Sequence, residues 1–235
     1  MHYFLLRFII ETFAHFLKWL FLDLTVEGWD NLPPYGPLLV IGNHFSWFEA
    51  PLIILLFPRR VRFVVMAELG KLWFFRPVFY AYGMIPIARG QVDRAGLREA
   101  EAALAQGEVV GIMPEGGIDP DVQAQVQAGE TATGGEMSRR SGQLIAARPG
   151  AALLAVRSGV PIVPVAFVGT EKVMGNVRRG RKTAVSFHIG LPFGPLTLPQ
   201  DLRGADRRHQ LDELGHQMMR CIAALLPPEN RGPYG

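Results

Sequence analysis

Residues 38–49 read Leu-Leu-Val-Ile-Gly-Asn-His-Phe-Ser-Trp-Phe-Glu, and this stretch decides how the chain folds. Its apolar beginning, Leu38 to Ile41, predicts a buried strand. The strand leads directly to Asn43 and His44, and after a short loop an apolar helix is expected from about Glu49 to Phe57. A buried strand that ends in a polar loop and is followed by a helix is typical of an α/β domain.

The same alternation continues along the chain. Apolar runs predict further strands at residues 61–65, 84–88, 109–113, 162–168 and 184–189. Helical patterns lie between them at residues 71–80 and 93–105. A final amphipathic helix has apolar residues at helical spacing from Leu211 to Leu225 and stops before Pro227. We therefore predict an α/β fold with a central, mostly apolar sheet flanked by helices.

The composition fits one domain that meets lipid. The chain has 235 residues, of which 49% are hydrophobic and 19% are charged, and its mean hydropathy is +0.17. Some of this apolar excess is expected to face a membrane. The net charge of only +3 does not indicate a nucleic-acid partner. The single cysteine, Cys221, excludes a disulfide framework within the chain and fits a reducing compartment, so we expect exposure to the cytoplasm.

The N-terminal segment, residues 1–24, is predicted to be a helix at the membrane interface. It is mostly apolar and aromatic, while Arg7, Glu11, His15 and Lys18 recur at helical spacing and form one polar stripe. Its apolar runs are much shorter than the roughly 18 residues of a membrane-spanning helix. An ordinary packing helix is the other interpretation, although so wide an apolar arc would need cover on nearly every side.

Four short segments in the middle of the chain resemble the lysophosphatidate acyltransferase family. They are Asn43-His-Phe-Ser-Trp-Phe-Glu49, Gly83-Met-Ile-Pro-Ile-Ala-Arg89, Pro114-Glu-Gly116 and Val160-Pro-Ile-Val-Pro-Val165. The resemblance covers about residues 36–190, and it depends on the order and spacing of all four segments. It implies an acyltransferase domain at residues 25–226 that resembles 1-acyl-glycerol-3-phosphate O-acyltransferases, followed by a flexible tail at residues 227–235.

The first segment is similar to the His-x4-Asp motif of that family, with Glu49 in place of the aspartate. His44 would act as the general base that takes the proton of an alcohol, and Glu49 would orient its imidazole. Within one helix the two side chains would diverge by roughly 140°, so His44 must precede the helix. Pro51 agrees, because proline is tolerated near a helix start. The alternative is a plain helix entry in which Ser46 and Glu49 form a capping box.

The other segments are predicted to bind the acceptor. In the family the arginine equivalent to Arg89 binds the acceptor's phosphate, a role that suits a guanidinium, although a surface arginine at a strand end is common. The loop at Glu115 is expected to position the acceptor, and the strand with Pro161 and Pro164 is expected at an edge or entry of the sheet, where a plain core strand is the alternative. The predicted substrate-binding residues are Asn43, Gly83, Arg89, Glu115, Gly116, Arg148, Pro161 and Pro164.

After Gly116 the chain departs from the family pattern of threonine and arginine. Residues 118–141 form a polar insertion, which could be a lid over the site or a tolerated surface insertion. Arg139, Arg140 and Arg148 are basic residues that could replace the missing arginine. Further on, Arg178, Arg179, Arg181 and Lys182 form a cluster that could meet anionic headgroups or the phosphates of coenzyme A, although solvated charge on a hairpin explains it nearly as well.

The resemblance implies transfer of a fatty acyl group from acyl-CoA or acyl carrier protein to the hydroxyl of 1-acyl-glycerol-3-phosphate, which gives phosphatidate. No cofactor is expected beyond that acyl donor, and no metal-site pattern or Gly-x-Ser-x-Gly elbow is present in the sequence. The expected location is the cytoplasmic face of a membrane. Two alternatives remain open, namely acylation of another lyso-lipid and a non-catalytic lipid-binding protein.

Overall fold

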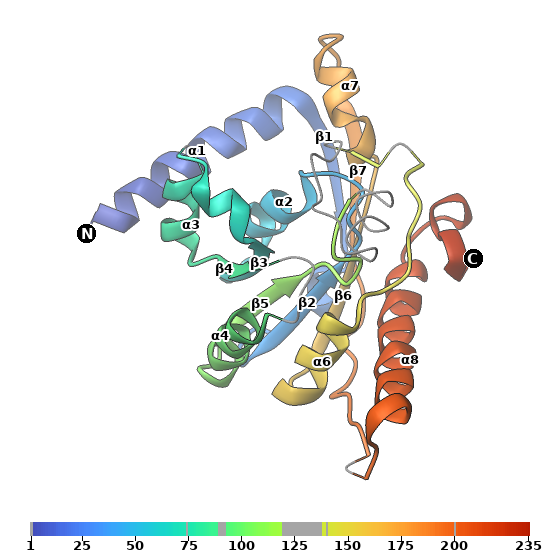
Figure 1. Cartoon of the computed structure of the whole chain (residues 1–235). Helices are drawn as coiled ribbons and strands as arrows, with labels where there is room; N and C mark the ends of the chain where they lie inside the picture. The colour runs from blue at the N-terminus through green and yellow to red at the C-terminus, as the bar shows by residue number, and fades with distance from the viewer. Residues whose placement is uncertain (1, 74, 89–92, 119–137, 140, 200) are drawn as a thin grey trace.

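A seven-stranded sheet lies at the centre of the computed structural model, with helices on both of its faces (Figure 1). The structure describes residues 2–73, 75–88, 93–118, 138–139, 141–199 and 201–235. The predicted α/β fold with a central sheet flanked by helices is therefore confirmed.

The strands lie in the order β1-β7-β6-β2-β5-β3-β4, and every neighbouring pair is parallel except β6 and β7. The strands predicted from apolar runs are confirmed to within one residue at either end. Their bounds are β1 (Leu22–Glu27), β2 (Leu38–Gly42), β3 (Val61–Met66), β4 (Ile85–Ile87), β5 (Val109–Ile112), β6 (Ile162–Val168) and β7 (Thr183–Ile189).

Strand β1 was not predicted, because its first three residues, Leu22 to Leu24, were assigned to the end of the N-terminal helix. That helix, α1 (His2–Phe21), ends three residues earlier than the predicted boundary at residue 24. From Leu22 to Glu27 apolar and polar side chains alternate, and their burial alternates with them. This period of two is the pattern of a half-buried strand, and β1 pairs with β7 at the edge of the sheet.

The two faces of the sheet have separate apolar cores. Leu39 and Ile41 of β2 pack toward α4 (Arg94–Ala105), α6 (Pro149–Ser158) and α8 (Gly204–Ala223). Leu38 and Val40 face the other way, toward α2 (Glu49–Leu56). Figure 1 shows α1 and α3 (Arg76–Tyr82) on the side of α2. Val173 of α7 (Val173–Val177) belongs to the same core as α2. The predicted helices at α2 and α4 are confirmed, α3 begins later than expected, and α6 and α7 were missed.

Strand β6 lies between β2 and β7, so the prediction that its prolines mark an edge or entry strand was wrong. The ladder between β6 and β7 covers only Val165 to Val168, and Pro164 lies just outside it. The missing N–H of Pro164 therefore breaks no bond to β7, while its carbonyl still accepts a hydrogen bond from the Gly190 amide at 2.9 Å. A central strand tolerates proline here because the pairing on that side is interrupted.

The C-terminal tail is packed against the domain, unlike the flexible tail that the sequence predicted. It forms two short 3-10 helices, η4 (Pro228–Asn230) and η5 (Gly232–Tyr234). The Leu144 amide donates to the Asn230 carbonyl at 2.9 Å, and the Ala147 amide donates to the Tyr234 hydroxyl at 3.3 Å. The tail thus supports the segment that precedes α6.

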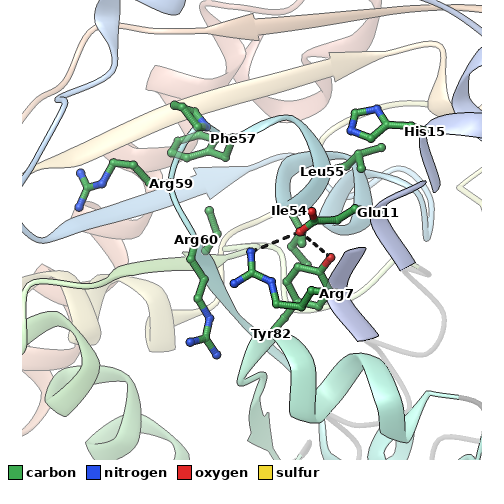
Figure 2. A pocket seen from close by; sticks show the side chains of 11 residues that line it. Arg7, Glu11, His15, Ile54, Leu55, Phe57, Arg59, Arg60 and Tyr82 are labelled. Carbon is green, nitrogen blue, oxygen red and sulfur yellow. Dashed lines mark hydrogen bonds and ion pairs between the residues drawn. The ribbon is translucent and has the colours of Figure 1, made fainter. Parts of the chain in front are cut away.

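Helix α1 turns part of its polar stripe toward the protein. Glu11 accepts a hydrogen bond from the Tyr82 hydroxyl at 3.1 Å and forms an ion pair with Arg7 at 3.3 Å, beside a cavity of about 210 Å³ (Figure 2). Burial, and then the neighbouring Glu11, raise the pKa of Tyr82 to about 12. The opposite side of α1 is an exposed apolar face, made of Leu5, Phe8, Ile9, Phe13, Phe16, Trp19 and Leu20. None of the helices described has the length and apolar character needed to cross a membrane.

Candidate active site

The site lies where β2 ends and the chain turns into α2. The buried side chain of Asn43 donates to the Phe167 carbonyl at 2.9 Å and accepts from the Phe167 amide at 2.7 Å. Both hydrogen-bonding groups of this amide are thus used to join the ends of β2 and β6. Asn43, predicted to bind substrate, fixes the position of the next residue, His44.

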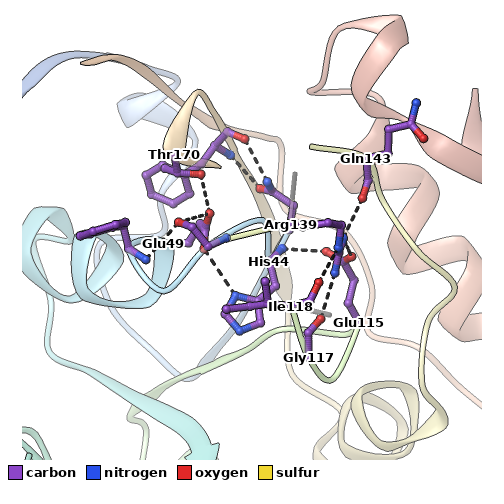
Figure 3. A network of polar contacts seen from close by, with 12 residues as sticks. His44, Glu49, Glu115, Gly117, Ile118, Arg139, Gln143 and Thr170 are labelled. Carbon is purple, nitrogen blue, oxygen red and sulfur yellow. Dashed lines mark hydrogen bonds and ion pairs between the residues drawn. The ribbon is translucent and has the colours of Figure 1, made fainter. Parts of the chain in front are cut away.

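His44 stands before α2, as the helix geometry predicted, and its ring turns back toward Glu49. Its Nδ1 lies 3.4 Å from Oε2 of Glu49, the first residue of the helix (Figure 3). The imidazole is 18% exposed, whereas the Glu49 side chain is fully buried. A partly exposed imidazole that faces a buried carboxylate is the arrangement of a general base and its orienting acid.

Three further donors hold the Glu49 carboxylate. The Ser46 amide and hydroxyl donate to it at 2.9 Å each, and the hydroxyl of Thr170 forms a short hydrogen bond to Oε1. The Ser46 hydroxyl also accepts from the Phe48 amide at 3.1 Å. The N-cap of α2 is Phe48, which makes no side-chain cap hydrogen bond, so the capping box of Ser46 and Glu49 that was the alternative interpretation is not formed. Ser46 instead helps to hold the carboxylate that faces His44.

Thr170 is a site residue that the sequence analysis missed. It begins the 3-10 helix η3 (Thr170–Lys172) directly after β6 and is fully buried. A single threonine after a strand carries no motif, so only its position at the same sheet edge as His44 could have indicated it.

Glu115 follows β5 and supports the backbone of the site. Its buried carboxylate accepts the His44 amide at 2.7 Å and the Ile145 amide at 3.2 Å, and it forms a close ion pair with Arg139. Desolvation raises the pKa of Glu115, and the Arg139 guanidinium and the His44 amide oppose that rise. Glu115 was predicted to position the acceptor; its contacts among the described residues are with the protein itself.

Arg139 is buried, and its side chain is hydrogen-bonded to residues at both ends of the polar insertion. Its guanidinium donates to the carbonyls of Ile118 at 2.6 Å, Gly117 at 2.9 Å and Gln143 at 2.7 Å, in addition to Glu115. These contacts join the two ends of the predicted insertion. Arg140 and residues 119–137 lie outside the described residues.

Arg148 is the basic residue nearest to Gly116. Gly116 has φ +70°, and a Cβ there would lie 2.5 Å from Cδ of Arg148, so only glycine lets this side chain pack so closely. The amide of Arg148, just before α6, donates to the Pro114 carbonyl at 2.8 Å. Its buried Nε has no hydrogen-bond partner among the described residues, and burial lowers its pKa. An unpaired buried donor beside the Glu115 loop suits an anionic ligand.

Among the described residues, Gly83, Pro161 and Pro164 form no hydrogen bond with His44 or Glu49. Gly83 ends α3 with φ +63°, and its carbonyl accepts from Nε of Arg62 at 2.7 Å. Pro161 contributes its carbonyl to the Leu39 amide at 3.0 Å in the sheet. Arg89 lies outside the described residues.

Comparison with known proteins agrees with this geometry. The family model described as Acyltransferase matches residues 23–168 of the chain. The chain belongs to the Acyltransferase family. The predicted resemblance is thus confirmed at the level of the family, and the match includes the His44 loop, the Glu115 loop and β6.

Individual relatives of this Acyltransferase chain carry one enzyme name. A 1-acyl-sn-glycerol-3-phosphate acyltransferase of Borreliella burgdorferi is 24% identical over 154 residues, which are 64% of this chain and 53% of that protein. The chloroplastic enzyme of the same name from Arabidopsis thaliana is 24% identical over 173 residues, which are 72% of this chain and 42% of that protein. The chain thus spans about half the length of these curated relatives.

A solved structure is similar to most of this chain. It is the crystal structure of the 1-acyl-sn-glycerophosphate (LPA) acyltransferase PlsC from Thermotoga maritima, with a TM-score of 0.59 and 25% sequence identity. The alignment covers 91% of this chain and 78% of that one. The likeness therefore extends beyond the residues of the family match.

Proposed function

We propose that the protein transfers a fatty acyl group from a thioester donor to the free hydroxyl of 1-acyl-glycerol-3-phosphate, which gives phosphatidate. The observation that carries the proposal is the contact between the partly exposed His44 imidazole and the buried Glu49 carboxylate. The names of the curated relatives support this choice of acceptor.

In the proposed reaction His44 is the general base. A proton on Nδ1 faces Glu49, so Nε2 on the other edge of the ring is available to the acceptor hydroxyl. As Nε2 takes the hydroxyl proton, the alcohol oxygen attacks the thioester carbonyl carbon. The C–S bond then breaks, an ester bond remains, and the departing thiolate takes the proton from the imidazolium. Glu49 stabilises the imidazolium between these steps.

For the acceptor's phosphate we propose Arg148 as one ligand. Its Nε lacks a partner among the described residues, and the side chain packs over Gly116 beside the Glu115 loop. Arg89 stays a prediction for the same role. Glu115 and Arg139 contribute indirectly, because they hold the backbone of His44 and the ends of the loop.

We also propose that α1 lies in the membrane interface on the cytoplasmic face. Its exposed aromatic and aliphatic side chains have the character of an interfacial helix, with one face toward lipid and the other toward the protein. Both acyl-CoA and acyl carrier protein suit the proposed chemistry as donors, because both present a thioester.

The test incubates the purified protein with lysophosphatidate and labelled acyl-CoA, and separately with an acyl carrier protein thioester. We expect labelled phosphatidate with at least one donor and its loss by about 10³-fold in His44→Ala. The matched control is His188→Ala, which removes a partly exposed histidine that also contacts a glutamate, Glu27, at 3.1 Å.

Three outcomes would contradict the proposal. Native-like turnover by folded His44→Ala would show that His44 is not the general base. Product formed only with other lyso-lipids would show that 1-acyl-glycerol-3-phosphate is not the acceptor. Absence of product with every donor and acceptor would favour the non-catalytic lipid-binding protein.

A further inference from the structure

The turn between α7 and β7 carries four exposed cations. Arg178, Arg179, Arg181 and Lys182 all lie on the surface, and within the described part of the chain none of them pairs with a carboxylate. We call residues 178–182 the basic turn.

Backbone hydrogen bonds give the basic turn a defined shape. The amides of Arg179 and Arg181 both donate to the carbonyl of Asn176, at 2.9 and 3.0 Å. The side chain of Asn176 donates to the Thr183 hydroxyl at 3.1 Å, at the start of β7. The four charged residues thus lie on one compact turn and are exposed, which concentrates positive charge at one place on the surface.

The basic turn adjoins the apolar face of α1. Leu22, the first residue after α1, pairs with Thr183, the first residue after the basic turn. The Lys182 ammonium lies 5.4 Å from the centre of the Trp19 ring, which belongs to the exposed face of the helix. Figure 1 shows the end of α1 and α7 at the same end of the sheet. The apolar face of α1 and the basic turn are therefore neighbours on the surface.

We propose that the apolar face of α1 and the basic turn form one docking surface for a bilayer that contains anionic lipids. This rests on the proposed interfacial position of α1. The apolar face enters the interface, and the basic turn at its end contacts the negatively charged headgroups. The aromatic ring under Lys182 suits a position at headgroup depth, where an apolar body and a charged tip are both accommodated.

The docking surface is also close to the candidate site along the chain. Thr170, which binds Glu49, begins η3, and η3 leads through α7 to the basic turn. Because lysophosphatidate and phosphatidate are themselves anionic, the basic turn would favour membrane regions rich in acceptor and product. The charge complementarity thus serves recruitment to the substrate.

The test measures co-sedimentation of the full chain with vesicles of phosphatidylcholine alone and of phosphatidylcholine mixed with phosphatidylglycerol. The variant is Arg178→Gln with Arg179→Gln and Arg181→Gln. Each neutralised charge should weaken anionic binding roughly fivefold at low salt, or about 100-fold together, and leave binding to neutral vesicles unchanged. Raising the salt concentration should abolish the preference of the native chain for anionic over neutral vesicles.

The matched control removes equal charge from α8, on the opposite face of the sheet, through Arg207→Gln, Arg208→Gln and Arg220→Gln. It should keep the anionic preference. The proposal is overturned if the basic-turn variant keeps the preference, if the α8 control loses as much, or if the native chain binds neither vesicle.

An acidic carrier protein is the competing occupant of the basic turn. It would be indicated if vesicle binding is unchanged in the basic-turn variant while the KM for an acyl carrier protein thioester rises. Phosphatidate synthesis from detergent-dispersed lysophosphatidate is measured beside these assays. It reports on the proposed reaction separately, so failure of the docking surface and failure of the reaction are distinguishable.

Discussion

Glu49 and Glu115 are two fully buried carboxylates that both contact His44, one at its ring and the other at its backbone amide. Their other partners differ. Glu115 faces the guanidinium of Arg139, a cation at every ordinary pH. Among the described residues Glu49 is bonded to Ser46 and Thr170, which are neutral, and to the titratable His44.

The difference indicates what each carboxylate is for. A buried charge needs a compensating partner, and Glu115 has a permanent one, so its ion pair is a fixed part of the fold. Glu49 gains a full counter-charge only when His44 is protonated, which in the proposed reaction happens during turnover. The contacts of Glu115 therefore hold the site in place, whereas in the proposed reaction Glu49 takes part in the chemistry through His44.

The largest expected effect on stability comes from breaking the permanent pair. Arg139→Met should lower the free energy of unfolding by about 3–5 kcal/mol, because it leaves the Glu115 charge buried without its cation. Denaturant unfolding measures the loss. Adding Glu115→Gln to this variant should restore part of the stability, since the unpaired charge is then absent. An unchanged unfolding midpoint for Arg139→Met would show that the pair is not structural.

A smaller effect, on kcat, is expected from removing one hydrogen bond to Glu49. Thr170→Val keeps the volume but removes one donor to Glu49, so the carboxylate should orient His44 less well and kcat should fall about tenfold. KM should change little, because Thr170 does not contact substrate in the proposed reaction. Thr170→Ser, which retains the hydroxyl, should recover most of kcat. Equal losses in the valine and serine variants would indicate a packing role instead.

The smallest effect lies outside the site, at the polar contact between α1 and α3. The pKa of Tyr82 is raised to about 12 from 10.0, so the folded state favours the neutral phenol. Its contribution should be complete below pH 10 and be lost as the pH rises from 10 toward 12. Comparing denaturant unfolding of the native protein and Tyr82→Phe across this range measures it. The native protein should lose more stability than the variant, and parallel curves would contradict this.

Much of the fold could be predicted because local patterns and tertiary structure agree. The apolar runs at β2, β5 and β6 are buried on both faces, so their hydrophobicity alone located them. Strand β1 was missed because the apolar count of α1 continues through Leu22 and Leu24, and only the alternation with Asp23 and Thr25 reveals the change of period. The tail after α8 was missed because it is held by hydrogen bonds to residues far away in sequence.

In the candidate site, too, contacts within one segment were predicted and contacts between distant segments were not. The pairing of His44 with Glu49 follows from spacing and helix geometry within one segment, and the structure has it as predicted. Thr170 and Arg139 reach the site from distant positions, which no local pattern encodes. Arg139 was a candidate for the family's missing arginine, but its burial against Glu115 depends on how the chain returns after residue 137. The sequence therefore predicted the contact between His44 and Glu49, but not the residues from distant positions that support it.

The most direct test of the division between the two carboxylates compares Glu49→Gln with Glu115→Gln, measuring kcat for phosphatidate formation and the free energy of unfolding for each. We predict that Glu49→Gln lowers kcat about 10³-fold while the protein stays folded, because the imidazolium loses its stabilising charge. Glu115→Gln should mainly lower the free energy of unfolding, since Arg139 is left buried without its anion. Native-like kcat in folded Glu49→Gln, or a greater loss of kcat in Glu115→Gln at the same folded fraction, would contradict this account.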